Sequence, residues 1–277
     1  MTEPERGRAP LVLGIQLEDE VRIDGARAGK PDVRDPVLLE RRIECVLRVL
    51  ARVQARATFF AEGRLADELD PAAWPGIVAA HELGSQGFTR TLVGRLGPDG
   101  FVDDARRGRE ALEHAANVEV RSFRAPELAA EGCDPWFGQS LADAGYTRDS
   151  SLLLATTPEG FAHTLPLAGS NDAVTEIPVA SVAFRKQRIA VLGSASLRML
   201  PLATIRLLFE HAQGQGFLPQ LLLQPSDFDP DGPTGIDPQQ GWRARFEHLV
   251  RTTGRDSIVG KLEQLAWRWK FVAIADV

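Results

Sequence analysis

The chain has 277 residues, of which 44% are hydrophobic and 25% charged. This globular composition excludes a disordered or collagen-like protein, and the length suffices for one large core or at most two domains. The net charge of −6, without a basic run, argues against a nucleic-acid partner.

Short apolar runs alternate with longer amphipathic stretches, which is typical of an α/β fold. The apolar segment 11–17 predicts a buried strand that ends in three acids, Glu18, Asp19 and Glu20. In chain order, the sequence predicts a helix at 36–54, a strand at 57–61, helical turns at 71–74 and 77–81, a strand and its loop at 82–88, a helix at 97–116, a strand at 118–123, a helix at 135–144, an extended stretch at 175–184, a helix at 201–213, a strand at 218–223, two further helices and a strand at 271–274.

We expect a single domain over 1–277, with a flexible tail at 1–9, a long loop at 227–241 and a C-terminal part at 242–277. The N-terminus is polar and lacks the apolar region of a signal peptide. No segment reaches the length of about 18 apolar residues that a membrane span needs. The sequence therefore predicts a cytoplasmic protein without a membrane span.

The two cysteines, Cys45 and Cys133, lie outside any Cys-x-x-Cys or Cys/His pattern, so they predict neither a disulfide framework nor a zinc knuckle. Six or seven strands alternating with helices suggest a parallel barrel or a doubly wound sheet. In both folds the chemistry is found at the C-terminal ends of the strands. The segments to inspect are 18–20, 86–90, 124–126 and 224–228.

Six motifs lie at these strand ends and in this order. They are Gln-Leu-Glu-Asp at 16–19, Ala-Thr-Phe-Phe at 57–60, His-Glu-Leu-Gly-Ser-Gln-Gly-Phe-Thr-Arg at 81–90, Phe-Arg-Ala-Pro at 123–126, Gly-Tyr followed by Asp-Ser-Ser at 145–151, and Leu-Gln-Pro-Ser-Asp-Phe-Asp-Pro at 223–230. The set resembles the polysaccharide deacetylases of the NodB-homology type (carbohydrate esterase family 4), and most closely the branch of exopolysaccharide and exosortase-associated loci. The resemblance implies a distorted parallel β/α barrel.

The resemblance also implies a divalent metal held by one Asp and two His, with a carboxylate as base and a His as acid. By position, Asp19 corresponds to the carboxylate ligand and Glu18 to the base. The other positions differ: Gln16 replaces the opening acid, Gln86 and Arg90 replace the two ligand histidines, and Gln224 replaces the histidine of the last motif. A glutamine carbonyl is a weak ligand, and a guanidinium has no lone pair to offer and repels a cation. We therefore expect no cofactor; a zinc site bound in an unusual way is the alternative.

Further residues have a structural and a functional interpretation. Arg124 either bridges loops or orients a site acid, as it does in the family, and Asp227 either forms an Asx turn or belongs to the site. His81 is expected to form hydrogen bonds at a helix end or behind the site. Trp267 and Trp269 are expected to pack in the core or at an edge.

Three functional hypotheses follow. The first is a pseudo-deacetylase that binds an acetamido sugar, or a partner from an exopolysaccharide or sugar pathway, without hydrolysis. The second is an active deacetylase with an atypical or metal-free site, in which Glu18 and Asp19 form the acid–base pair. The third is an enzyme adapted to another small molecule.

Under the third hypothesis Gln16, Gln86 and Gln224 contact the substrate, and Arg90, Arg124 and Asp227 are further candidates for binding. The simultaneous loss of every site histidine favours the first hypothesis over the second. The expected partner is a saccharide or small molecule, with a protein partner left open. We also predict that Arg90 points into the former metal position and pairs with Asp19, directly or through one water, with Gln86 beside it.

Overall fold

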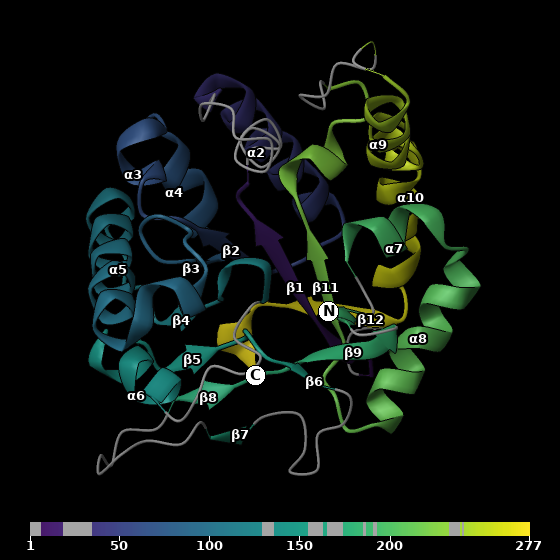
Figure 1. Ribbon diagram of the computed structural model, residues 1–277. Helices are drawn as coiled ribbons and strands as arrows, with labels where there is room; N and C mark the ends of the chain where they lie inside the picture. Colours follow the sequence, from purple (N-terminus) through teal and green to yellow (C-terminus); the bar gives the residue numbers. More distant parts are fainter. Residues whose placement is uncertain are drawn as a thin grey trace.

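A computed structural model describes residues 7–18, 35–128, 136–154, 163–164, 174–184, 187–190, 193–232, 239 and 241–277. Its main sheet has the order β11-β1-β2-β3-β4-β5-β8-β7, and β12 also pairs with β1 (Figure 1). The strands are β1 (Ala9–Gln16), β2 (Thr58–Ala61), β3 (Glu82–Ser85), β4 (Ser122–Phe123), β5 (Arg148–Asp149), β7 (His163–Thr164), β8 (Thr175–Glu176), β11 (Gln220–Leu223) and β12 (Trp269–Val272). A smaller sheet contains β6 (Leu153–Leu154), β9 (Val179–Phe184) and β10 (Gln187–Ala190).

Helices cover the outer side of the curled main sheet (Figure 1). They are α2 (Pro36–Arg52), α3 (Leu65–Glu68), α4 (Ala73–Val78), α5 (Val93–Ala116), α6 (Trp136–Asp143), α7 (Ser194–Met199), α8 (Leu202–Gly214), α9 (Trp242–Thr252) and α10 (Ile258–Ala266). The pairs of the main sheet are parallel except β7 with β8. The predicted α/β fold is thus confirmed, as a parallel half barrel with one antiparallel edge strand.

Several predicted elements differ in extent from the observed ones. β1 already begins at Ala9, inside the expected tail, and the strand expected at 118–123 is reduced to β4. α5 begins at Val93 and is interrupted at Gly97, whose φ of 67° is not helical, so the breaker lies inside the helix. The expected loop at 227–241 starts within the short 3₁₀ turn η3 (Pro225–Phe228), and positions 233–238 and 240 lie outside the described residues. Among the described residues, no helix is both long and apolar enough to cross a membrane.

Side-chain alternation along β1 separates the core from the barrel interior. Leu11, Leu13, Ile15 and Leu17 are buried in the core formed with the helices. Val12 belongs to a second cluster that includes Phe60 and Ile177, on the other face of the strand. Because successive residues of a strand point to opposite faces, Gly14, Gln16 and Glu18 follow Val12 toward the interior of the barrel.

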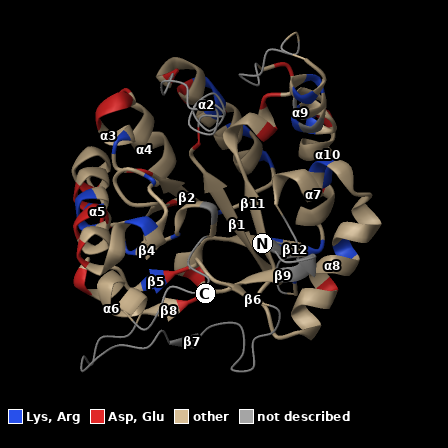
Figure 2. Ribbon diagram, viewed as in Figure 1, with Lys and Arg blue, Asp and Glu red and all other residues tan. Residues whose placement is uncertain are grey.

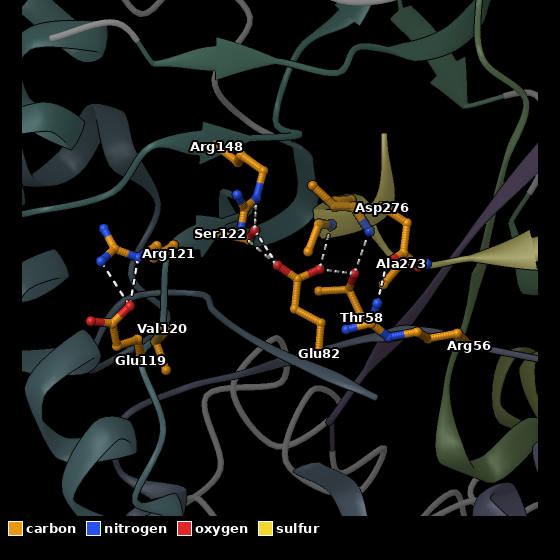
Figure 3. A network of polar contacts seen from close by, with 12 residues as sticks. Arg56, Thr58, Glu82, Glu119, Val120, Arg121, Ser122, Arg148, Ala273 and Asp276 are labelled. Carbon is orange, nitrogen blue, oxygen red and sulfur yellow. Dashed lines mark hydrogen bonds and ion pairs between the residues drawn. The ribbon is translucent and has the colours of Figure 1, made fainter. Parts of the chain in front are cut away.

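A buried carboxylate ties three strands to the C-terminus at the start of β3 (Figure 3). Thr58 and Ser122 donate their hydroxyl hydrogens to the two oxygens of Glu82, at 2.6 and 2.5 Å. The backbone N–H of Ala275, in the C-terminal 3₁₀ turn η5 (Ile274–Asp276), also donates to Glu82, at 2.9 Å. Arg148 of β5 supplies the positive charge, with its Nη2 3.4 Å from Glu82 Oε1. Glu82 therefore holds β2, β4 and the chain end in one network.

We expect Glu82→Ala to lower the free energy of unfolding by about 3–5 kcal/mol, because it leaves buried donors without an acceptor. Urea unfolding followed by circular dichroism measures this change. Glu119→Ala is the matched control: Glu119 also pairs with an arginine, but its side chain is 73% exposed, so its loss should cost less than about 1 kcal/mol. Equal effects of the two substitutions would contradict the structural role of the Glu82 network.

Candidate functional site

The inward-facing positions at the C-terminal ends of neighbouring strands bring four predicted residues together. Glu18 follows β1, Gln86 follows β3, Gln224 follows β11, and Arg90 lies four residues beyond Gln86. Glu18 and Gln86 are 5% and 1% exposed, whereas Gln224 and Arg90 are half-buried. The strands of the order β11-β1-β2-β3 end at one edge, so residues far apart in the sequence form one strand-end cluster.

Glu18 is the centre of this cluster. Arg90 donates from Nη2 to Glu18 Oε1 in a close ion pair, and the two side chains are 15% and 3% exposed. Gln224 Nε2 donates to the other oxygen, Oε2, at 2.8 Å. A carboxylate at this depth is stable in its charged form only with such partners, because burial penalises an unpaired charge. The guanidinium therefore supplies the positive charge at this edge of the sheet.

The predicted contact of Arg90 with Asp19 stays a prediction, and the structure shows another pair. We expected Arg90 to bond Asp19, which lies outside the described residues, whereas the structure pairs it with Glu18. Strand alternation accounts for the observed pair, because Glu18 shares the inward face of Val12 and Gly14. Gln86 does lie at the same edge, since its N–H donates to the carbonyl of Ala61 at 2.8 Å.

Arg90 is held in a backbone conformation that costs energy. Its φ of 54° is in the left-handed region, which side chains other than glycine adopt with strain. The ion pair with Glu18 is a force that can hold it there. Gln86 is unusual in another way: both of its amide atoms are buried and have no hydrogen-bond partner among the described residues.

A second buried carboxylate at this edge, Glu62, was not among the predicted residues. Glu62 follows β2, is 3% exposed, and lies next to Gln86 when the β2–β3 register is extended by one residue beyond Ala61 and Ser85. Thr58 and Phe60 of β2 face inward, so strand alternation places Glu62, two residues further on, on the same face; this pattern could have indicated Glu62 as a site residue.

Arg124 occupies the barrel interior and is fully buried. It donates to the carbonyl and hydroxyl oxygens of Ser150 at 2.9 and 2.7 Å and to Gln220 Oε1 at 2.8 Å. Its guanidinium lies 4.3 Å from the ring centroid of Phe60. Burial lowers the pKa of Arg124 to about 10. These contacts join β4, β5 and β11, which corresponds to the bridging interpretation; direct contact with a substrate stays a prediction.

A Cβ added at Gly14 would lie 2.6 Å from Nη1 of Arg124. β1 therefore needs a glycine at this position to make room for the guanidinium.

Asp227 anchors the segment that carries Gln224. It accepts the backbone N–H of Gln224 at 2.8 Å, in a capping arrangement, and pairs with Arg198 at 2.6 Å and with Ser194. It is fully buried, and burial raises the pKa of its carboxyl group. Both interpretations of Asp227 apply in part, because the turn that Asp227 forms positions Gln224, a residue of the site.

Other predicted residues lie away from the cluster or add little to it. Gln16 is half-buried at the end of β1, and its carbonyl accepts the N–H of Glu18 at 2.8 Å. His81 precedes β3 at the opposite end of that strand, packs 5.2 Å from the Phe59 ring, and has its pKa lowered to about 4 by burial and by Arg56. Trp269 is buried as predicted, whereas Trp267 is 86% exposed.

A pair of carboxyl groups is buried beside Arg124. Asp149 and Glu176 are register partners on β5 and β8, and neither is exposed. Burial raises the pKa of both groups, and that of Glu176 is raised further by the charge of Asp149. One oxygen of each has no other hydrogen-bond partner among the described residues, which fits one proton shared between them.

Two family models match the chain in succession. Residues 35–148 match the polysaccharide deacetylase family, and residues 154–277 match DUF3473, a domain of unknown function. A comparison with curated protein sequences found no match.

Among solved structures, a candidate polysaccharide deacetylase from Mycobacterium smegmatis is 18% identical, with a TM-score of 0.57; the alignment covers 98% of this chain and 96% of that one. A CE4 family pseudoenzyme from Bacillus anthracis is 15% identical over 98% of this chain and 65% of its own, with a TM-score of 0.47. A family 4 carbohydrate esterase from Streptomyces lividans is 12% identical over 93% and 87% of the two chains, with a TM-score of 0.48. The first of these confirms the fold that the resemblance implied.

We expect Arg90→Ala to lower the free energy of unfolding by about 3–5 kcal/mol, because it leaves Glu18 buried without its cation. Alanine has a Cβ like arginine, so the strain at the left-handed φ stays and the loss reports the ion pair. The matched control is Arg268→Ala, whose pair with Glu210 is mostly exposed and should contribute less than about 1 kcal/mol. Urea unfolding measures both; similar small losses would show that the Arg90 pair is solvated.

We expect the Asp149–Glu176 pair to make stability depend on pH. Its raised pKa values mean that the folded state holds a proton more tightly than the unfolded state. This stabilisation is complete below the ordinary carboxyl pKa and is lost as pH rises through the raised values. Glu176→Gln supplies a permanent N–H donor in place of the shared proton. Between pH 5 and 8 the unfolding free energy of this variant should therefore fall less than that of the unmodified chain. The two slopes should differ by at most about 1.4 kcal/mol per pH unit.

Urea unfolding at several pH values tests this expectation. Glu119→Gln, at an exposed carboxylate, is the control and should follow the unmodified chain. Parallel pH profiles for Glu176→Gln and the unmodified chain would show that the pair shares no proton.

Proposed function

We propose that this chain binds an acetamido-bearing saccharide without hydrolysing it, since residues 35–148 match the polysaccharide deacetylase family and residues 154–277 match a domain of unknown function. We place this role in an exopolysaccharide or related sugar pathway, on the strength of the motif resemblance. The single observation that carries the proposal is the ion pair of Arg90 with Glu18 at the strand ends, where the family resemblance calls for a metal ligand.

The described residues at this edge do not fit a divalent metal. Arg90 has no lone pair to donate, and its charge repels a cation. Both oxygens of Glu18 already accept hydrogen bonds, from Arg90 and Gln224. Gln86 offers only an amide carbonyl, which is a poor substitute for an imidazole. No group of three or more His, Cys, Asp or Glu that could hold a metal occurs in the described part of the chain.

The same contacts argue against Glu18 as a general base. A base must reach the proton of a water molecule with a free lone pair directed at it. One lone pair of each Glu18 oxygen is taken by Arg90 or Gln224, so water must compete with these donors for the carboxylate. His81, the histidine of the motif at 81–90, lies before β3 and is therefore far from the edge where the chemistry would occur.

The polar groups of the cluster suit binding rather than water activation. Gln86 presents an N–H₂ donor and a carbonyl acceptor that have no partner among the described residues. An acetamido group has the complementary acceptor and donor, so the two amides can form a reciprocal pair of hydrogen bonds. The half-buried Arg90 and Gln224 lie on the more accessible side of the cluster.

We expect the purified chain to bind oligomers of N-acetylglucosamine, to bind fully deacetylated oligomers at least about tenfold more weakly, and to release no acetate with or without added zinc. Calorimetry, elemental analysis and an acetate assay measure these three properties. Gln86→Met keeps the side-chain volume but removes both amide groups, so it should weaken binding. Gln213→Met, at an exposed glutamine of α8, should not. Stoichiometric metal together with acetate release would overturn the proposal.

The double variant Gln86→His and Arg90→His is the positive control for the metal argument. It restores both imidazoles, and histidine tolerates the left-handed φ at position 90 better than most residues do. Zinc affinity measured by calorimetry should rise in the double variant and not in either single variant, since a tight site needs several donors. A double variant that stays folded by circular dichroism and binds no zinc would show that these two residues do not account for the missing metal site.

A further inference from the structure

Helix α9 presents its apolar face to solvent. Trp242, Phe246 and Leu249 are 74%, 64% and 60% exposed, and their spacing of four and three residues places them in one stripe along the helix. Single exposed apolar residues are common on protein surfaces, but three large ones on one helical face mark an interaction site.

The half-buried side of α9 has no large apolar residue among those whose side chains the structure describes. Ala244, His248, Arg251 and Thr252 are half-buried against the body of the protein. A surface helix normally has the reverse orientation, with its apolar stripe on the core. The described core of this protein therefore does not explain the stripe.

Arginines flank the stripe. In the sequence α9 contains Arg243, Arg245 and Arg251 against one glutamate, so it is basic within a chain whose net charge is −6. Figure 2 shows blue on α9, whereas α5 on the opposite side of the molecule carries both blue and red. The guanidinium of Arg243 lies 5.5 Å from the ring of Trp242, so charge and apolar surface are adjacent.

We propose that the face of α9 formed by Trp242, Phe246 and Leu249 docks on an anionic lipid bilayer. A short amphipathic helix with aromatic residues on one face and arginines beside it lies in the plane of a membrane interface. Tryptophan favours that interface because its ring is amphipathic, and arginine pairs with lipid phosphates. A second copy of the chain would be a poorer partner for this face, because a symmetric contact would bring the arginines of two α9 helices together.

Docking through α9 would orient the strand-end cluster. Arg255, which follows α9, donates to the carbonyls of Asp229 and Gly232, close after the 3₁₀ turn that follows Gln224. In Figure 1, α9 lies at the end of the barrel toward which β1 points. The membrane contact and the proposed saccharide site are thus at the same end of the barrel, so a saccharide attached to a lipid could reach that site.

The test is flotation of the full chain with vesicles of phosphatidylglycerol mixed with phosphatidylcholine. We expect binding at low salt, loss of binding at about 1 M salt where the Debye length is about 3 Å, and little binding to phosphatidylcholine alone. The double variant Trp242→Ser and Phe246→Ser should reduce the bound fraction at least about tenfold, and Arg243→Glu by a similar factor.

Two substitutions serve as matched controls. Trp267→Ser removes an equally exposed tryptophan outside α9, and Arg95→Glu reverses an exposed charge on α5; neither should change vesicle binding. Unchanged thermal unfolding of the α9 variants would confirm that they are folded. Failure of the unmodified chain to float with anionic vesicles would overturn the proposal, and so would equal losses in the Trp267→Ser variant. Self-association that the α9 substitutions abolish, without vesicle binding, would assign the face to a second copy instead.

Discussion

A carboxylate buried at the end of a strand needs a positive charge within reach, and the pair of Glu18 with Arg90 meets this need at the open end of the barrel. Much of the local structure depends on it. Gln224 is directed to the second oxygen of Glu18, and its segment is fixed in turn by Asp227 and Arg198. The left-handed backbone of residue 90 is acceptable because its side chain has this partner.

Two further groups of buried charges inside the barrel are balanced in the same way. Arg124 lies among Asp149, Glu176 and the more distant Glu82, and Glu82 is itself neutralised by Arg148. Each of these buried charges is therefore matched by an opposite charge or by a shared proton, and space is made for the guanidinium of Arg124 by Gly14. The polar interior belongs to the framework of the fold, and a substitution there is expected to act on stability before it acts on function.

The sequence predicted the fold and the strand-end positions because apolar runs and motif order are local signals. Motif position alone indicated Asp19, which lies outside the described residues, as the partner of Arg90, whereas strand alternation indicates the observed pair with Glu18. Leu11, Leu13, Ile15 and Leu17 are all large and apolar, which already places Glu18 on the other face. Other features had no local signal. The two-residue strands β5 and β8 exist through their neighbours in the sheet, and their pairing brings Asp149 beside Glu176.

The exchange of a metal for a guanidinium would change what this edge of the barrel can do. A divalent ion and a guanidinium both stabilise a buried carboxylate, but only the ion can bind a water molecule and lower its pKa. Arg90 offers fixed N–H donors instead, which bind a carbonyl or hydroxyl oxygen and leave water unactivated. Under the proposed function, the ion pair therefore keeps the electrostatic balance of the fold while the chemistry moves from hydrolysis to recognition. Under the same proposal the pair gives Glu18 a structural role, because its removal would leave Arg90 buried in part, strained and without this anion.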